Sequence, residues 1–154
     1  MPLTAAKVLA AKPNGGRTVY TIGKESPVLD AIRLMAEKGV GALVVLADQR
    51  IAGIVSERDY ARKVELLGRT AGETRVEEIM TTAVRYVEPE QTVDECMALM
   101  TEHRMRHLPV LDGGTLSGLI SIGDLVKSQI ADQQFTISQL EHYIQGTPPT
   151  LGRL

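Results

Sequence analysis

The chain has 154 residues, of which 44% are hydrophobic and 23% are charged, and its net charge is −2. This length suits one domain or two closely packed halves, and the charge excludes a nucleic-acid binder that relies on a general basic surface. The single cysteine, Cys96, excludes an internal disulfide, and its helical spacing favours core packing. We find neither a membrane-length apolar stretch nor a signal-peptide pattern, and therefore expect a cytoplasmic protein.

The first half of the chain alternates between strand and helix patterns. A helix begins at Ser26-Pro27, because proline is tolerated in a first turn, and ends at Gly39, where glycine suits a left-handed cap. Short apolar runs on either side of the polar turn 48–50 predict two paired strands. The predicted elements are a short N-terminal helix, a strand over 19–22, a helix over 26–39, strands over 42–46 and 51–55, and a helix from Ser56 to Gly68.

The second half shows the same order of patterns. The turn 112–114 contains two glycines, which accept positive φ without penalty and therefore favour a hairpin. Beyond this unit, residues 137–144 have helical spacing that ends at Gly146, and 147–150 have the composition of a loose tail. The predicted elements are a helical turn over 76–80, a strand over 83–87, a helix from Thr92, strands over 107–111 and 116–120, and a helix from Ser121.

The two halves are an internal repeat. Residues 25–59 align with residues 90–124 without a gap, at an offset of 65, and 11 of the 35 pairs are identical. Two copies are too few for a solenoid, so we expect a pseudo-symmetric pair that buries one shared face. The boundaries predicted are 8–68 for the first repeat, 76–131 for the second, and 132–154 for a C-terminal helix and tail.

A Ser-x-x-Asp motif stands at the strand-to-helix junction of each repeat, as Ser56 with Asp59 and as Ser121 with Asp124. One interpretation is a capping box, in which the serine and the acid bond to each other's backbone amides. The other is a ligand site, because helix N-termini suit phosphate and a carboxylate accepts hydrogen bonds from a ribose diol. Arg58 then offers a bidentate phosphate contact. The residues alone leave both interpretations open.

Other polar groups give weaker signals. His103 and His107 lie four residues apart, but no third ligand is evident, and we expect no metal site. The basic residues beside them, Arg104 and Arg106, suit either a phosphate or a solvated edge. We find no nucleophile with a base and no converging pair of acids, and we expect no enzymatic activity.

Two β-α-β-β-α units that end in Gly-apolar-apolar-Ser-x-x-Asp resemble the CBS domain pair, or Bateman module. The motifs that carry the resemblance are residues 53–59 and residues 107–111 followed by 118–121, and the likeness extends over about 8–131. Residues 135–146 resemble the ending of stand-alone bacterial members. The resemblance implies an α+β fold, in which two three-stranded sheets pack about a pseudo-twofold axis and leave two clefts.

The resemblance also implies a ligand, because such clefts bind adenosyl compounds: AMP, ADP or ATP, with NAD or S-adenosylmethionine as alternatives. By position, Asp59 and Asp124 hold ribose hydroxyls, and Ser56, Arg58 and Ser121 meet phosphate. Arg106 reaches phosphate from the opposing repeat. The candidate walls of the first cleft are Thr21, Ile22, Gly41, Ala42 and Val55, and those of the second are Thr82, Val84, His107, Leu108, Pro109 and Ile120.

The function implied is that of a non-catalytic regulatory module that transmits energy or redox state to a partner protein and forms a homodimer. The clefts are expected to be unequal, because Gly123 stands in the second motif where Arg58 stands in the first. Two alternatives stay open. One is an interaction module that keeps the helix caps without a ligand, and the other is a nucleotide-hydrolysing enzyme.

Overall fold

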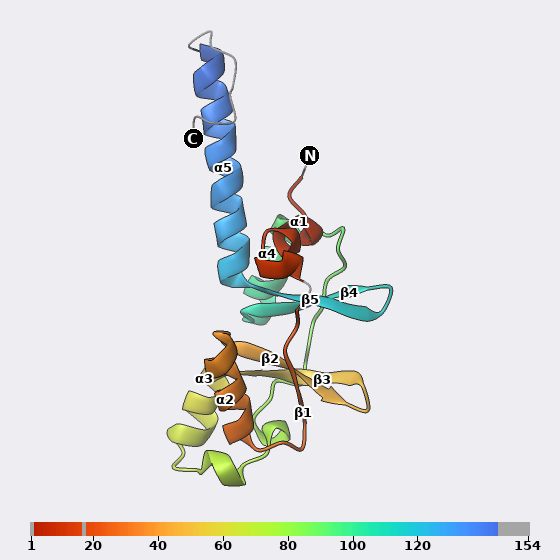
Figure 1. Ribbon diagram of the computed structural model, residues 1–154, viewed down its shortest axis with the longest axis vertical. Coiled ribbons are helices and arrows are strands. Elements are labelled where there is room, and N and C mark those ends of the chain that lie inside the picture. The colour runs from red at the N-terminus through yellow and green to blue at the C-terminus, as the bar shows by residue number, and fades with distance from the viewer. Residues whose placement is uncertain (1, 17, 145–154) are drawn as a thin grey trace.

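Two small sheets, one from each repeat, lie face to face at the centre of the molecule, with helices on their outer sides (Figure 1). The computed structural model describes residues 2–16 and 18–144, without the side chain of Asn14. Helices of the first repeat cover one end of this stack, and helices of the second repeat cover the other. The predicted α+β architecture of two packed repeats is therefore confirmed.

The first repeat contains a three-stranded sheet in the order β1-β2-β3, in which β1 is parallel and β3 antiparallel to β2. Its main helix ends as predicted, because Gly39 adopts a left-handed φ of 67°. The helix after Ser56 is short and continues as a π-helical turn. The elements are β1 (Thr21–Gly23), α2 (Val28–Lys38), β2 (Ala42–Ala47), β3 (Arg50–Ser56), α3 (Glu57–Tyr60) and the π-helix η2 (Ala61–Glu65).

The second repeat has a smaller sheet, and the strand predicted over 83–87 is wrong. Only Val87 pairs with β4, through hydrogen bonds of 3.0 Å to Pro109 O and 2.9 Å from Leu111 N–H. The residues before it are mostly exposed, so no alternating buried face holds them in register. The elements are α4 (Val93–His103), β4 (His107–Asp112), β5 (Thr115–Ser121) and α5 (Ile122–Ile144).

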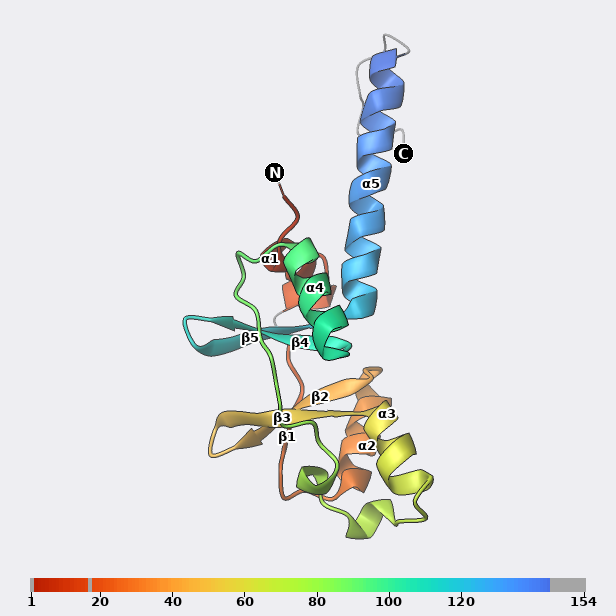
Figure 2. The ribbon, with the colours of Figure 1, turned by 180° about the vertical axis from the view of Figure 1, so that it is seen from behind.

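The segments that precede the repeats cross over, so that each packs on the other repeat. The N-terminal helix α1 (Ala5–Ala10) and turn η1 (Pro13–Gly16) lie beside α4, and the turn η4 (Val76–Glu78) lies on the first repeat (Figures 1 and 2). Matching hydrogen bonds join Ala5 N–H to Gln91 O at 2.8 Å and Val76 N–H to Ser26 O at 2.8 Å. These donors lie 71 residues apart, and the alignment at an offset of 65 therefore does not detect them.

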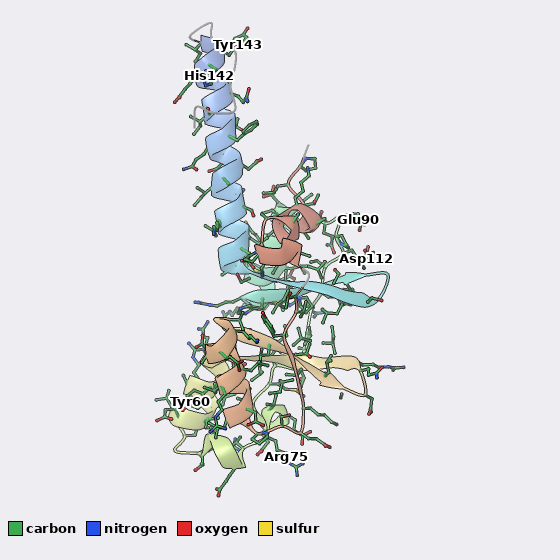
Figure 3. All side chains as sticks on the ribbon, viewed as in Figure 1. Tyr60, Arg75, Glu90, Asp112, His142 and Tyr143 are labelled. Carbon is green, nitrogen blue, oxygen red and sulfur yellow. The ribbon has the colours of Figure 1, made fainter. Side chains whose placement is uncertain are left out.

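The helix that begins after Ser121 is longer than the sequence analysis predicted. No separate helix forms over 137–144, because α5 runs without a break for 23 residues, through the expected boundary at residue 131. Its far half projects beyond the rest of the molecule, where Figure 3 labels His142 and Tyr143. The predicted end at Gly146 and the tail 147–150 lie outside the described residues.

Each repeat has its own aliphatic core between its sheet and its helices. In the first, side chains of α2 such as Met35 pack on Leu43 and Val55, and in the second α4 packs on Leu108 and Ile120. Cys96 is fully buried in the second core, and burial raises the pKa of its thiol. Within the described residues, no helix is both long enough and apolar enough to span a membrane.

Candidate functional site

The two strand-to-helix junctions have the same backbone geometry. Where β3 ends, Glu57 N–H donates to Gly41 O at 3.1 Å, and where β5 ends, Ile122 N–H donates to Arg106 O at 2.9 Å. The first amide of each helix, which would otherwise be unpaired, thus bonds to the residue just before the neighbouring strand. This contact fixes the angle at which each helix leaves its sheet.

The first junction is a complete capping box. Ser56 N–H donates to Asp59 Oδ2 at 2.9 Å, and Asp59 N–H donates to Ser56 Oγ at 3.2 Å. The second carboxylate oxygen, Oδ1, lies 3.2 Å from Lys63 Nζ, one helical turn further along. Lys63 also donates to the carbonyl of Ile79 at 2.8 Å. The carboxylate is largely shielded, because the side chain of Asp59 is 14% exposed.

The second junction repeats this cap with a different lysine. Ser121 N–H donates to Asp124 Oδ2 at 2.9 Å, and Asp124 N–H donates to Ser121 Oγ at 3.0 Å. Lys12, from the N-terminal segment, donates to the same Oδ2 at 2.8 Å. Burial alone raises the pKa of Asp124, but the hydrogen bonds from Lys12 and Ser121 outweigh burial and hold this pKa below its usual value.

The capping interpretation of Ser-x-x-Asp is therefore confirmed in both repeats. It does not exclude ligand binding, since a capping carboxylate keeps acceptor positions beyond those that the cap uses. It does set a condition, because both acids already accept hydrogen bonds from the protein. A ribose at either acid has to use the acceptor positions that these donors leave free, or displace one of the donors.

His107, the first residue of β4, connects the two junctions electrostatically. Burial lowers the pKa of its imidazole, and the carboxylate of Asp124 opposes this effect. The charges of Lys12 and Arg106 lower the pKa further, and the carboxylate of Asp59 raises it. One half-buried imidazole is thus within electrostatic range of the acids of both repeats.

The predicted wall and phosphate-binding residues fall into four groups by burial. Val55, Leu108 and Ile120 are fully buried in the cores on the helix side of their sheets. Arg58, Arg106 and Thr82 are exposed, as expected of groups that meet a ligand or solvent. The half-buried residues are Thr21, Ile22, Gly41, Val84 and His107, and the buried residues Ala42 and Pro109 complete the set.

The sequence analysis missed two kinds of residue at this site. Val44 and Ile54 are buried but belong to neither core cluster. Strand alternation places their side chains on the face of the sheet opposite to that of Leu43 and Val55, toward the second sheet. That alternation was a usable signal. Lys12 gave none, because its contact with Asp124 joins residues 112 positions apart.

Comparison with known proteins identifies the repeats. The CBS domain profile matches twice, over residues 16–66 and 76–131. A solved Burkholderia ambifaria protein with CBS domains, classed provisionally with signal transduction, is 72% identical, with a TM-score of 0.81 over 88% of this chain and 99% of that one.

Two curated relatives match over most of this chain. The mitochondrial CBS domain-containing protein CBSX3 of Arabidopsis thaliana is 40% identical over 127 residues, which are 79% of this chain. Inosine-5'-monophosphate dehydrogenase of Thermoplasma acidophilum is 32% identical over 117 residues, which are 73% of this chain. The chain spans 62% of the first relative's length and 22% of the second's, and in the dehydrogenase the match is confined to the CBS part.

Proposed function

We propose a regulatory function for this chain, which belongs to the CBS-domain family and carries two CBS domains in tandem. CBS-pair proteins are regulatory or signal-transduction modules. In our proposal the chain is a non-catalytic cytoplasmic module that binds an adenine nucleotide, AMP, ADP or ATP, in clefts between the repeats. NAD and S-adenosylmethionine are the alternative ligands. Binding transmits energy or redox state to a partner protein.

The observation that carries this proposal is that acids of both repeats act on the same imidazole, that of His107. Two shielded carboxylates from different repeats lie within electrostatic range of this half-buried group. Capping a helix needs only one local acid and does not require the two caps to converge. A ligand between the repeats makes use of that convergence, because a ribose diol bonds to a carboxylate and its phosphate meets nearby cations.

In this arrangement each group has a defined role. Asp59 and Asp124 accept hydrogen bonds from ribose hydroxyls, and the exposed guanidinium groups of Arg58 and Arg106 meet phosphate. Ser56 and Ser121 donate to phosphate only if their hydroxyls leave the cap, so we assign them the smaller share. The purine lies against the inter-sheet surface, of which Ala42 and Pro109 form part.

Regulation follows if the nucleotide binds one arrangement of the repeats better than another. A ligand shifts such an equilibrium only by its difference in affinity for the two states. A site built from both repeats has this property, since any change in their relative position changes the distance between its two halves.

The test is to replace each acid by asparagine and to titrate AMP, ATP, NADH and S-adenosylmethionine by calorimetry. Asparagine keeps the size of the side chain and one acceptor oxygen, so the caps persist while the charge is lost. We expect Asp59→Asn and Asp124→Asn each to weaken binding at one cleft by at least about tenfold. With a nucleotide present at 100 times its Kd, the unfolding free energy of the wild-type protein should rise by about 2.7 kcal/mol. The proposal would be refuted if none of the four compounds bound to the wild-type protein.

The second candidate is an interaction module without a ligand, and the completed capping boxes favour it. Under this hypothesis the acids serve only their helices. The same two asparagine variants then lower stability slightly, and wild-type protein shows no thermal shift with any of the four compounds.

We also propose that the chain forms a homodimer through α5. Along the exposed part of this helix, six positions alternate at intervals of four and three residues, and five of them are apolar with exposures between 42% and 82%. Such spacing is that of a coiled-coil seam, which requires a second helix. The six positions are Val126, Ile130, Gln133, Ile137, Leu140 and Ile144.

Charge favours a second copy of this chain in antiparallel orientation. In that orientation the end of one seam meets the beginning of the other, and Lys127 of one copy flanks Glu141 of the other. We expect Ile137→Asp to convert a dimer to a monomer in size-exclusion chromatography with light scattering. Phe135→Asp, an equal change on the opposite side of the helix, is the control. Dissociation by the control alone would place the interface elsewhere.

A further inference from the structure

Lys12 joins the N-terminal segment to the second cap. Its Nζ donates to Asp124 Oδ2 and to the carbonyl of Leu119, each at 2.8 Å. The lysine side chain is 31% exposed and the aspartate side chain 24% exposed, so water screens this ion pair only in part. The ammonium group therefore lies at the carboxylate to which we assign the ribose of the second cleft.

The segment that carries Lys12, residues 5–16, is called here the N-terminal strap. It is held on the second repeat by packing as well as by the ion pair. Leu9 covers Gly118 so closely that a Cβ on that glycine would lie 2.6 Å from Leu9 Cδ2. Ala6 N–H donates to Pro89 O at 2.9 Å. The ion pair of Lys12 is thus one of several attachments of the strap to the second repeat.

The first cap is connected differently. The lysine at Asp59 is Lys63, which belongs to the helical segment that the cap begins and pairs with Oδ1, the oxygen that the cap leaves free. Lys63 also donates to the carbonyl of Ile79, so its contact with the crossing segment uses a backbone carbonyl and not the acid. Displacing Lys12 releases a contact between the strap and the second repeat.

We propose that Lys12 and a ribose compete for Asp124, so that nucleotide binding in the second cleft loosens the attachment of the strap around Lys12. This inference rests on the proposed function and adds a regulatory output to one of its two clefts. The strap is then the element whose mobility reports occupancy of the second cleft.

The reason for competition is the number of acceptor positions. Each oxygen of a carboxylate offers about two, and Oδ2 of Asp124 already accepts from Ser121 N–H and from Lys12. A diol that bonds to both carboxylate oxygens needs one of these positions. Ser121 N–H is fixed by the cap, whereas the lysine has a flexible stem and is partly exposed to water. The lysine is therefore the donor that leaves.

The test uses calorimetry with AMP on protein that already carries Asp59→Asn, so that the second cleft dominates binding. Adding Lys12→Met removes the competitor, and we expect AMP to bind about threefold to tenfold more tightly. Lys7→Met removes an equal charge from an exposed position of the same strap and is the matched control, with no expected change. Unchanged or weaker binding by Lys12→Met would overturn the competition.

Hydrogen exchange of the wild-type protein gives a second readout. The amides of Ala11 and Lys12 bond within the strap, and we expect saturating AMP to raise their exchange rates at least about threefold. Binding of AMP with unchanged exchange would refute loosening of the strap and leave the proposed function standing. If no adenosyl compound binds to wild-type protein or to either lysine variant, the proposed function and this inference both fail.

Discussion

The two repeats build the same capped acid with lysines from different parts of the chain. In the first repeat the lysine comes from one turn further along the helical segment, and in the second it comes from the N-terminal strap, 112 residues away. The caps are local and therefore repeat with the sequence. The charge that balances each acid depends on what packs over the junction, and this differs because the segments before the repeats cross over. Sequence symmetry thus defines the site, and packing makes its two copies unequal.

The same contrast holds where the crossing segments meet the sheets. Gly53 in β3 and Gly118 in β5 are equivalent glycines, and each lies under a residue of a crossing segment. The atoms nearest to Gly53 include the backbone carbonyl of Thr81, whereas the atoms nearest to Gly118 are the end of the Leu9 side chain. The difference gives the largest effect that we predict.

Gly53→Ala should be more destabilising than Gly118→Ala. A Cβ at position 53 would lie 2.6 Å from Thr81 O, which Ile54 and Thr81 hold in place by hydrogen bonds of 3.0 Å and 2.9 Å. The three atoms nearest to a Cβ at position 118 all belong to the side chain of Leu9, which can rotate. We expect losses of about 3 kcal/mol and about 1 kcal/mol in the unfolding free energy, measured by urea titration. Equal losses would show that the two crossings are equally rigid.

The charge at the second cap should make stability depend on pH. Because the folded protein holds the pKa of Asp124 below its usual value, this acid stabilises the fold above its unfolded pKa, and the contribution is lost as pH falls through the folded pKa. We expect Asp124→Asn to cost about 1 kcal/mol at pH 7, and the difference from wild type to vanish under acidic conditions.

Unfolding by urea at pH 7 and in steps below pH 4 measures this difference. Asp112→Asn, at the exposed end of the β4–β5 hairpin (Figure 3), removes an equal charge away from Lys12 and is the control. A difference between Asp124→Asn and wild type that persists after both acids are protonated would mean that the ion pair is not its cause.

The smallest predicted effect concerns the two hairpin turns. Both place two successive residues at positive φ, with Asp48 at 51° and Gln49 at 65° in the first, and Gly113 at 59° and Gly114 at 84° in the second. Gln49→Gly should raise the midpoint of urea unfolding by an amount equivalent to about 0.5 kcal/mol, because glycine relieves the strain of a left-handed residue. Gly114→Gln should have the opposite sign. A loss of stability in Gln49→Gly would show that the glutamine side chain matters more than its backbone strain.

The sequence predicted the features that repeat or that depend on neighbouring residues. Gly39 indicated the end of α2, and the Ser-x-x-Asp motif placed both caps, since the preferences behind them act within a few residues. The equivalent end of α4 was not predictable in this way, because Arg104 adopts a left-handed φ of 52° that arginine rarely takes. The absence of the strand predicted over 83–87 also depended on burial, because only Val87 of this segment is buried.

The amino-acid sequence alone determined the two repeats, their order of elements and the two acids at equivalent junctions. These features depend on short-range periodicity and on helix capping. Only the tertiary structure decided which segment packs on which repeat, and with it the pairing of Lys12 with Asp124. That contact joins residues 112 positions apart, and no local preference records it. It arises because the segment before the first repeat buries its apolar residues, Leu9 among them, against the second.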